Sequence, residues 1–202
     1  MRHRQASRGF TLIEVLVAIT IVVLGLLGLA GMQARAQVAE LESYQRAQAL
    51  VILYDMMDKM QNNRQAASCF VNSSGTYYGD TSAAPSLTCS ASTAANNALA
   101  AAAMTEVHNQ LQGAGETKSS VKVGAMVGAR ACVTYASATE YLNAATGIAY
   151  GGTGEYTLMV SWQGMVDTYT PTKTCGTAAQ YGTDTKRRTV WATMRVGTLA
   201  AQ

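Results

Sequence analysis

The apolar run near the N-terminus constrains this chain more than any other feature. From Val15 to Ala34 there are 20 consecutive uncharged residues, and none of them is proline. At about 1.5 Å rise per residue, such a helix is roughly 30 Å long, which matches the hydrocarbon core of a bilayer. The sequence therefore predicts one membrane-spanning helix close to the N-terminus.

Basic residues in front of this run predict its orientation. Arg2, Arg4 and Arg8 all precede it. Because cytoplasmic flanks carry an excess of Lys and Arg, the N-terminus is expected in the cytoplasm and the rest of the chain outside it.

Glu14 is the only charged residue between Phe10 and Ala34. A carboxylate within an apolar segment costs about 2.5–3.5 kcal/mol near the bilayer centre and less near its edge. One interpretation is that Glu14 lies at the cytoplasmic interface and reaches the headgroups. The other is that cleavage between Gly9 and Phe10 creates a cationic amine, which neutralises Glu14 of a neighbouring copy or relative during assembly.

The residues Gly9, Phe10, Thr11, Leu12, Ile13 and Glu14, behind a short basic leader and ahead of an apolar run, resemble the type IV pilin family. The resemblance implies that prepilin peptidase of the inner membrane cuts after Gly9 and that Phe10 is N-methylated. It implies a role for Glu14 in assembly. Pilins and the pseudopilins of secretion systems share this motif.

An ordinary secretory signal is the competing interpretation, because Ala34, Arg35 and Ala36 form an A-x-A cleavage pattern. Its apolar region would be about 20 residues long, against roughly 7–15 in such signals, and Glu14 would interrupt it. A mature N-terminus at Phe10 supports the pilin interpretation, and one at Gln37 supports the secretory signal.

Charge and length bound the remainder of the chain. The net charge of +3 comes from the three leader arginines, because their removal leaves 12 basic and 12 acidic side chains. General attraction to nucleic acid or anionic lipid is not indicated. We expect a cleaved leader at 1–9, a membrane and filament-core segment at 10–36, and one globular head at 37–202 that includes the amphipathic half of the helix.

Four cysteines follow the membrane segment, in the compartment where disulfides persist. They are spaced too widely for a C-x-x-C metal or redox motif. Two disulfides are expected, and three pairings of the four exist. Proximity in sequence favours Cys69 with Cys89, and the family resemblance favours both this pair and Cys132 with Cys175.

One helix is predicted from Phe10 to about Arg64, and it becomes amphipathic beyond Gln33. Its apolar stripe has helical spacing and should pack under the head. Asp55 with Lys59 and Glu42 with Arg46 are i, i+4 ion pairs of the opposite face. The stripe comprises Leu50, Leu53, Met57 and Met60, widened by Ile52 and Met56.

The segment from Ser43 to Arg64, SYQRAQALVILYDMMDKMQNNR, is similar to the segment after the membrane helix in the minor pilins called type IV pilus modification proteins (PilV). An Ala, Leu and Asp pattern there ends in a basic residue, Asn and Arg, and a cysteine follows closely. This resemblance favours a minor pilin over a major one.

The rest of the chain predicts an α+β head. A loop is expected over 65–92, a short helix over 93–112, and a long Thr- and Gly-rich connection over 164–186. Alternating apolar residues mark four strands of an antiparallel sheet, one face of which covers the long helix. They are Val121 and Val123; Ala131, Val133 and Tyr135; Tyr156, Leu158, Val160 and Trp162; and Val190, Ala192, Met194 and Val196.

Motifs of catalysis are absent from the sequence, which contains no G-x-S-x-G, phosphate loop or H-E-x-x-H. His108 lacks a second nearby ligand, so no metal and no cofactor are expected. The basic run Lys186, Arg187 and Arg188 is expected to be a solvated turn, with contact to DNA or a pilus partner as the minority alternative.

These observations together predict a non-enzymatic filament subunit with a pilin-like fold. The resemblance implies storage in the inner membrane with a periplasmic head. It also implies incorporation with other minor pilins into a complex that primes or caps the extracellular pilus of the major pilin. Twitching motility and adhesion would depend on it. The alternatives are a pseudopilin of type II secretion, and a head that binds a surface or DNA ligand through the loops at 65–92 and 164–186.

Overall fold

The computed structural model of the chain describes residues 9–115, 117–119, 121–122 and 126–197. The chain divides into two compact units, 1–43 and 44–202. We call the first the stem unit and the second the head unit, and describe each by itself.

Helix α1, Leu12–Asn62, runs through both units without a break. Proline is absent from its 51 residues, so no backbone donor is lost along it. The helix ends at Asn62, because the next residue, Asn63, leaves helical geometry with φ −110° and ψ 45°; its amide nitrogen Nδ2 donates a 2.8 Å bond to the carbonyl of Lys59. The predicted helix over Phe10–Arg64 is confirmed to within two residues at each end.

In the head unit, one face of α1 is buried. Leu50 and Met57 flank this face and are partly buried. The predicted apolar stripe is therefore confirmed as core. The buried residues of the helix are Ala49, Ile52, Leu53, Met56 and Met60, of which all but Ala49 belong to the predicted stripe.

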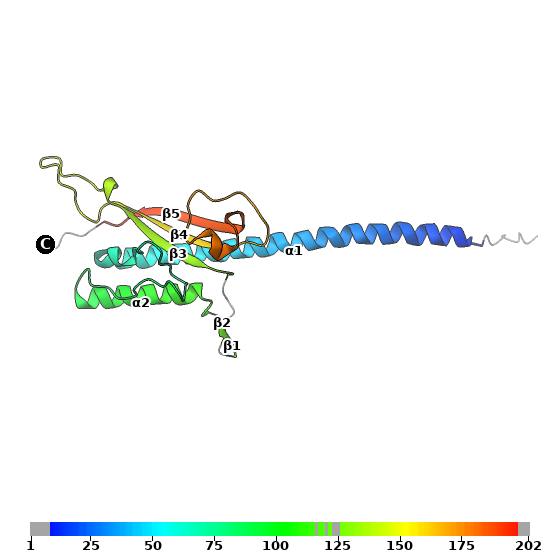
Figure 1. Cartoon of the computed structure of the whole chain (residues 1–202), viewed down its shortest axis with the longest axis horizontal. Coiled ribbons are helices and arrows are strands. Elements are labelled where there is room, and N and C mark those ends of the chain that lie inside the picture. Colours follow the sequence, from blue (N-terminus) through cyan, green and yellow to red (C-terminus); the bar gives the residue numbers. More distant parts are fainter. Residues whose placement is uncertain (1–8, 116, 120, 123–125, 198–202) are drawn as a thin grey trace, which may run out of the picture. The chain divides into compact units, whose positions relative to one another are not determined.

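Helix α2, Ala94–Leu111, follows a 3-10 turn, η1, at Arg64–Phe70 and an irregular loop. The Thr93 hydroxyl caps its start by accepting a bond from the N–H of Asn96, and Gly113 beyond its end has φ +78°. It lies beside the head half of α1 (Figure 1), to which the 3.1 Å ion pair of Lys59 with Glu106 ties it. Its buried residues are Ala100, Met104, Val107 and Leu111.

The sheet consists of β3 (Arg130–Ala136), β4 (Glu155–Gln163) and β5 (Arg187–Arg195), antiparallel and in that order. Leu158 pairs with Val133 on one side and with Ala192 on the other. This register places the apolar residues predicted for the three strands side by side, so that they form rows across the core face of the sheet. Short 3-10 turns lie at Ser137–Thr139 (η2), Ala178–Tyr181 (η3) and Asp184–Lys186 (η4).

The fourth strand predicted for this sheet, at Val121 and Val123, is not part of it among the residues that the structure describes. Val121 lies in β2 (Val121–Lys122), which pairs with β1 (Thr117–Lys118) in a separate two-stranded hairpin, and Val123 lies outside the described residues. The edge of β3 is instead met by Tyr78, whose backbone exchanges two 3.0 Å hydrogen bonds with Ala131. Because these backbone groups of Ala131 are already paired, no further strand can bond to them.

Two disulfides hold the head, and they are the predicted pairs. Cys69–Cys89 closes a sequence separation of 20 residues and joins η1 to the loop before α2. Cys132–Cys175 closes 43 and joins β3 to the connection between β4 and β5. The second pair packs with Met159 in a small cluster separate from the main core.

Candidate functional site

The N-terminal motif lies at the very start of α1. Gly9, Phe10 and Thr11 precede the helix, and the carbonyl of Thr11 accepts bonds from the N–H groups of Glu14 (3.1 Å) and Val15 (3.4 Å). Glu14 thus occupies the first helical turn, where the helix dipole favours a negative charge. Among the residues that the structure describes, no hydrogen bond or ion pair involves its carboxylate.

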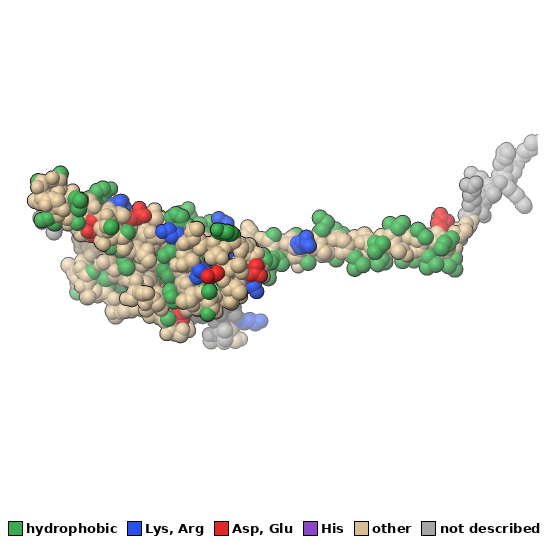
Figure 2. All heavy atoms as spheres, turned by 45° about the horizontal axis from the view of Figure 1, so that its top comes forward, with side chains coloured by type: hydrophobic (Ala, Val, Ile, Leu, Met, Phe, Trp, Pro, Cys, Tyr) green, Lys and Arg blue, Asp and Glu red, His purple; other side chains and the backbone are tan. Residues whose placement is uncertain are grey.

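Apolar side chains of the stem unit are exposed all the way round the helix. The exposed fraction of the large ones between Phe10 and Met32 runs from 47% for Val15 to 82% for Phe10. Figure 2 shows hydrophobic side chains along the stem. A helix that is apolar on every side requires an apolar environment, either lipid or other helices.

Length and composition make α1 able to cross a membrane. Its polar residue Thr20 is compatible with lipid, because the hydroxyl donates a 2.8 Å bond to the carbonyl of Leu16 within the helix. Gly25, Gly28 and Gly31 would meet nothing within 4 Å if each carried a Cβ. No contact among the described residues therefore requires glycine there.

The residues of the competing cleavage pattern, Ala34, Arg35 and Ala36, lie inside the unbroken helix α1. Gly9 and Phe10, in contrast, lie outside regular structure. The helix begins only after the predicted pilin-type cleavage site.

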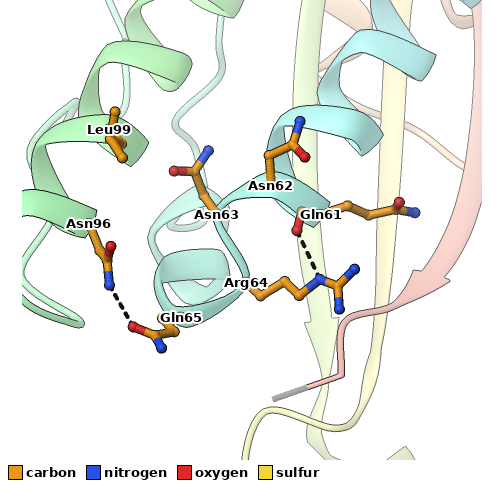
Figure 3. A pocket seen from close by; sticks show the side chains of 7 residues that line it. All are labelled: Gln61, Asn62, Asn63, Arg64, Gln65, Asn96 and Leu99. Atoms are coloured by element: carbon orange, nitrogen blue, oxygen red, sulfur yellow. Dashed lines mark hydrogen bonds between the residues drawn. The ribbon is translucent and has the colours of Figure 1, made fainter. Parts of the chain in front are cut away.

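The head unit contains a shallow amide-rich pocket of about 440 Å³ at the end of α1 (Figure 3). Its polar groups are largely used within the fold. Asn96 donates a 2.5 Å bond to the side-chain oxygen of Gln65, and Arg64 Nε donates a 3.0 Å bond to the carbonyl of Gln61. The pocket lies where helix α1 ends, and its lining residues include no pair of an acidic and a basic side chain that could exchange a proton. Its lining residues are Gln61, Asn62, Asn63, Arg64, Gln65, Asn96 and Leu99.

A buried ion pair that sequence reasoning missed joins distant parts of the head. The Asp80 carboxylate, 4% exposed, accepts a 2.7 Å bond from Arg130 Nε and a 3.2 Å bond from Gln180. Burial raises the pKa of Asp80, but bonds from Arg130, Ser82 and Ala83 outweigh it and hold the pKa well below its usual value. No short-range pattern signals this pair, because its members are 50 residues apart.

The predicted solvated turn at Lys186–Arg188 is wrong for its central residue. Arg187 is only 5% exposed, forms a 2.6 Å ion pair with Asp184 and donates a 2.8 Å bond to the carbonyl of Gly176. Its guanidinium lies 5.7 Å from the ring centroid of Tyr181, which also packs near Arg130. Arg187 therefore holds the β4–β5 connection in place, since its guanidinium is paired with groups inside the fold.

His108 has a structural role. Its Nδ1 accepts a 3.1 Å bond from the N–H of Gly79, and its Nε2 lies 2.8 Å from the amide of Gln112. Within the described residues, no group of three His, Cys, Asp or Glu side chains could hold a metal ion.

Comparison with protein families gives a match at the N-terminus. Residues 4–30 match the family model of the prokaryotic N-terminal methylation motif. Neither the curated proteins nor the solved structures contain a significant match to the chain. The matched segment covers Gly9, Phe10 and Glu14, and the motif indicates a type IV pilin-type or pseudopilin protein that is processed by prepilin peptidase and anchored in a membrane through its apolar helix.

Proposed function

We propose that this chain is a minor pilin of the type IV pilus, most similar to the PilV type. The observation that carries the proposal is the methylation motif at the start of a helix whose stem half is apolar and exposed on every side. In this proposal the leader 1–9 is removed after Gly9, Phe10 is N-methylated, and residues 10–36 pass from the inner membrane into the filament core. The chain has a structural role and no catalytic one.

Glu14 directs assembly in this proposal. Its carboxylate has no partner among the described residues, and transfer into an apolar core without one costs about 2.5–3.5 kcal/mol. Cleavage after Gly9 creates an amine at Phe10 that remains cationic after methylation. The amine of a neighbouring subunit can neutralise Glu14, so only processed subunits in register avoid the cost.

The minor-pilin assignment is supported by the segment 43–64. It forms the head half of α1, which ends at Asn62, and Cys69 follows in a disulfide. This order of helix end, basic residue and cysteine is that of the PilV resemblance. The head would lie in the periplasm before assembly and on the pilus surface afterwards, beside other minor pilins and the major pilin.

A type II secretion pseudopilin shares the N-terminal motif and is the second candidate. A chromosomal deletion separates the two: loss of piliation and twitching with normal protein secretion supports the minor pilin, and the opposite phenotype supports the pseudopilin. DNA or surface binding by the head is a weaker alternative, since Arg187 of the basic run is buried.

Mass spectrometry of the mature protein tests the processing step. We expect an N-methylated Phe10 as first residue. An intact leader, or a first residue at Gln37, would contradict the proposal.

Glu14→Ala tests the assembly step. We expect at least a tenfold lower amount of the variant in sheared pili, with membrane insertion unchanged, because the amine of the neighbour loses its partner. Glu40→Ala is the matched control, since Glu40 is an exposed carboxylate on the same helix. Equal amounts of the Glu14→Ala variant and the native protein in sheared pili would refute this role.

A further inference from the structure

Three of the four charged residues that α1 contributes to the stem unit recur at multiples of seven. Glu14, Arg35 and Glu42 belong to this series, and Glu40 does not. Residues seven apart drift by only about 20° around a straight helix, and they share one seam when helices supercoil. From Glu14 to Glu42 the drift is about 80°, so the three charges lie along one side of the helix.

Arg35 has no acidic partner within its own helix. Side chains of one helix meet at spacings of three and four residues. The residues at those spacings from Arg35 are Gly31, Met32, Val38 and Ala39. Its guanidinium is exposed and forms no hydrogen bond or ion pair with any residue that the structure describes. A partner for this charge must therefore come from outside the helix.

The start of α1 allows the processed amine to lie about one heptad ahead of Glu14. Phe10 and Thr11 precede the helix, and the Thr11 carbonyl accepts its first hydrogen bonds. Non-helical backbone extends by up to about 3.3 Å per residue, against about 1.5 Å in a helix. The amine of Phe10 can thus lie up to about 10 Å before Glu14, and one heptad of helix rises by about 10.5 Å.

A shift of one heptad between two parallel stems joins two pairs of opposite charges. The shifted copy presents its Phe10 amine at the height of Glu14 of its neighbour. The same shift brings its Arg35 to the height of Glu42 of that neighbour. Opposite charges attract most strongly where lipid or packed helices exclude water.

Other registers along the seam fit the charges or the apolar run less well. Without a shift, Glu14 meets Glu14 and Arg35 meets Arg35, so like charges repel. A shift of three heptads joins Glu14 to Arg35, but it displaces the uncharged run by about 30 Å, which is its own length. The apolar side chains would then face polar segments instead of one another.

Glu40 is the other acid within reach in height. A shift of five residues, about 7.5 Å, would bring Arg35 level with it. Glu40 lies about 140° around the helix from Arg35, away from the seam. The shift of one heptad is therefore the register in which the charges of the seam face one another.

We infer that neighbouring copies of this chain pack as parallel stems shifted by seven residues, with an ion pair between Arg35 of one copy and Glu42 of the next. The inference rests on the proposed function, because the amine at Phe10 exists only after cleavage. Arg35 and Glu42 are positioning residues that fix the register beyond the apolar run. A carboxylate accepts several bonds, so Glu42 can accept Arg35 alongside contacts within its own chain.

Disulfide crosslinking in inner-membrane vesicles tests the shift. All four cysteines of the chain are paired in the head, so a cysteine introduced into the stem is the only free thiol. Cells express two differently tagged full-length copies, one with Met32→Cys and one with Ala39→Cys, at exposed positions seven residues apart. After oxidation we expect at least tenfold more of the mixed dimer than of either same-position dimer. Equal yields, or no mixed dimer, would overturn the inference.

Charge reversal in the same assay tests the ion pair. We expect Arg35→Glu and Glu42→Arg each to lower the yield of mixed dimer at least tenfold, because like charges then meet. Both changes together in every copy should restore the yield to within twofold of native. Glu40→Arg is the matched control and should leave it within twofold, since Glu40 lies off the seam. A double variant that does not recover would overturn the ion pair.

Glu14→Ala separates this inference from the assembly role of Glu14. If Glu14→Ala lowers the yield tenfold and Arg35→Glu leaves it within twofold, the inference is overturned and the proposed function stands. If Arg35→Glu and Glu42→Arg lower the yield and Glu14→Ala does not, the inference is supported and the role of Glu14 is contradicted.

Discussion

The stem unit and the head unit differ in the exposure of their apolar side chains. In the stem, Leu24 is 65% exposed and lies in an uncharged run from Val15 to Ala34. In the head, Leu158 is fully buried between two paired strands and the helices. The stem therefore depends on an environment that the chain does not supply, whereas the head supplies its own core.

This difference separates two kinds of stability within one chain. Head stability is a property of contacts inside residues 44–197, including both disulfides. Placement of the stem depends on lipid or on other helices. Both tryptophans, Trp162 and Trp191, lie in the head, so their fluorescence reports unfolding of the head alone.

The largest expected effect tests whether the head is stabilised independently of the stem. Replacement of both Cys132 and Cys175 by Ser should lower the free energy of unfolding of the head by about 4 kcal/mol on the chain-entropy account. Urea unfolding of the full chain in detergent, followed by tryptophan fluorescence, measures it. Membrane insertion of the stem should not change.

The other disulfide is the matched control. Replacement of Cys69 and Cys89 by Ser should cost about 3 kcal/mol, because the closed loop is shorter. A larger loss from this pair than from the first would contradict the dependence on loop length.

The next effect compares one chemical change in the two units. Leu158→Ala should destabilise the head by about 3 kcal/mol, since it leaves a cavity between strands. Leu24→Ala should leave the unfolding midpoint of the head unchanged. A shift of the same size in both variants would break the comparison.

The smallest effect concerns the ion pair of Asp80 with Arg130. Asp80→Asn should lower the free energy of unfolding of the head by about 2 kcal/mol at pH 7, because the partly buried Arg130 loses a charged acceptor. The folded state depresses the pKa of Asp80, so its contribution is complete above an unfolded pKa of about 4 and is lost as pH falls below that value.

Urea unfolding at pH 7 and pH 3 measures this dependence. The difference between Asp80→Asn and the native protein should narrow at pH 3. Asp58→Asn is the control, since Asp58 is exposed on α1. A gap that widens at pH 3 would show that the sign of the linkage is wrong.

Much of the fold was predictable because local patterns carry it. The uncharged run predicted the stem helix, the spacing of Leu53, Met56 and Met60 predicted the buried face, and Thr93 with Gly113 marked the ends of α2. Alternating residues predicted β3, β4 and β5. The disulfide pairing agreed with the structure, although it rested partly on the family resemblance.

Other features could not be predicted, since their partners are far apart in sequence. Gln180 reaches Asp80 across 100 residues, and the burial of Arg187 depends on Asp184, Gly176 and Tyr181 meeting in three dimensions. The residue that meets the edge of β3 is Tyr78, which is 53 residues from Ala131 in sequence, so no local pattern pointed to it.

The candidate site divides in the same way. Gly9, Phe10 and Glu14 were predicted as site residues from sequence alone, because the motif that contains them is a local property of the chain. No pattern in the sequence predicted the hairpin at 140–154. Only the tertiary structure paired its arms, fixed its base on Glu140 and Arg195, and left its apolar side chains outside the core, since exposure is decided by which distant segments pack together.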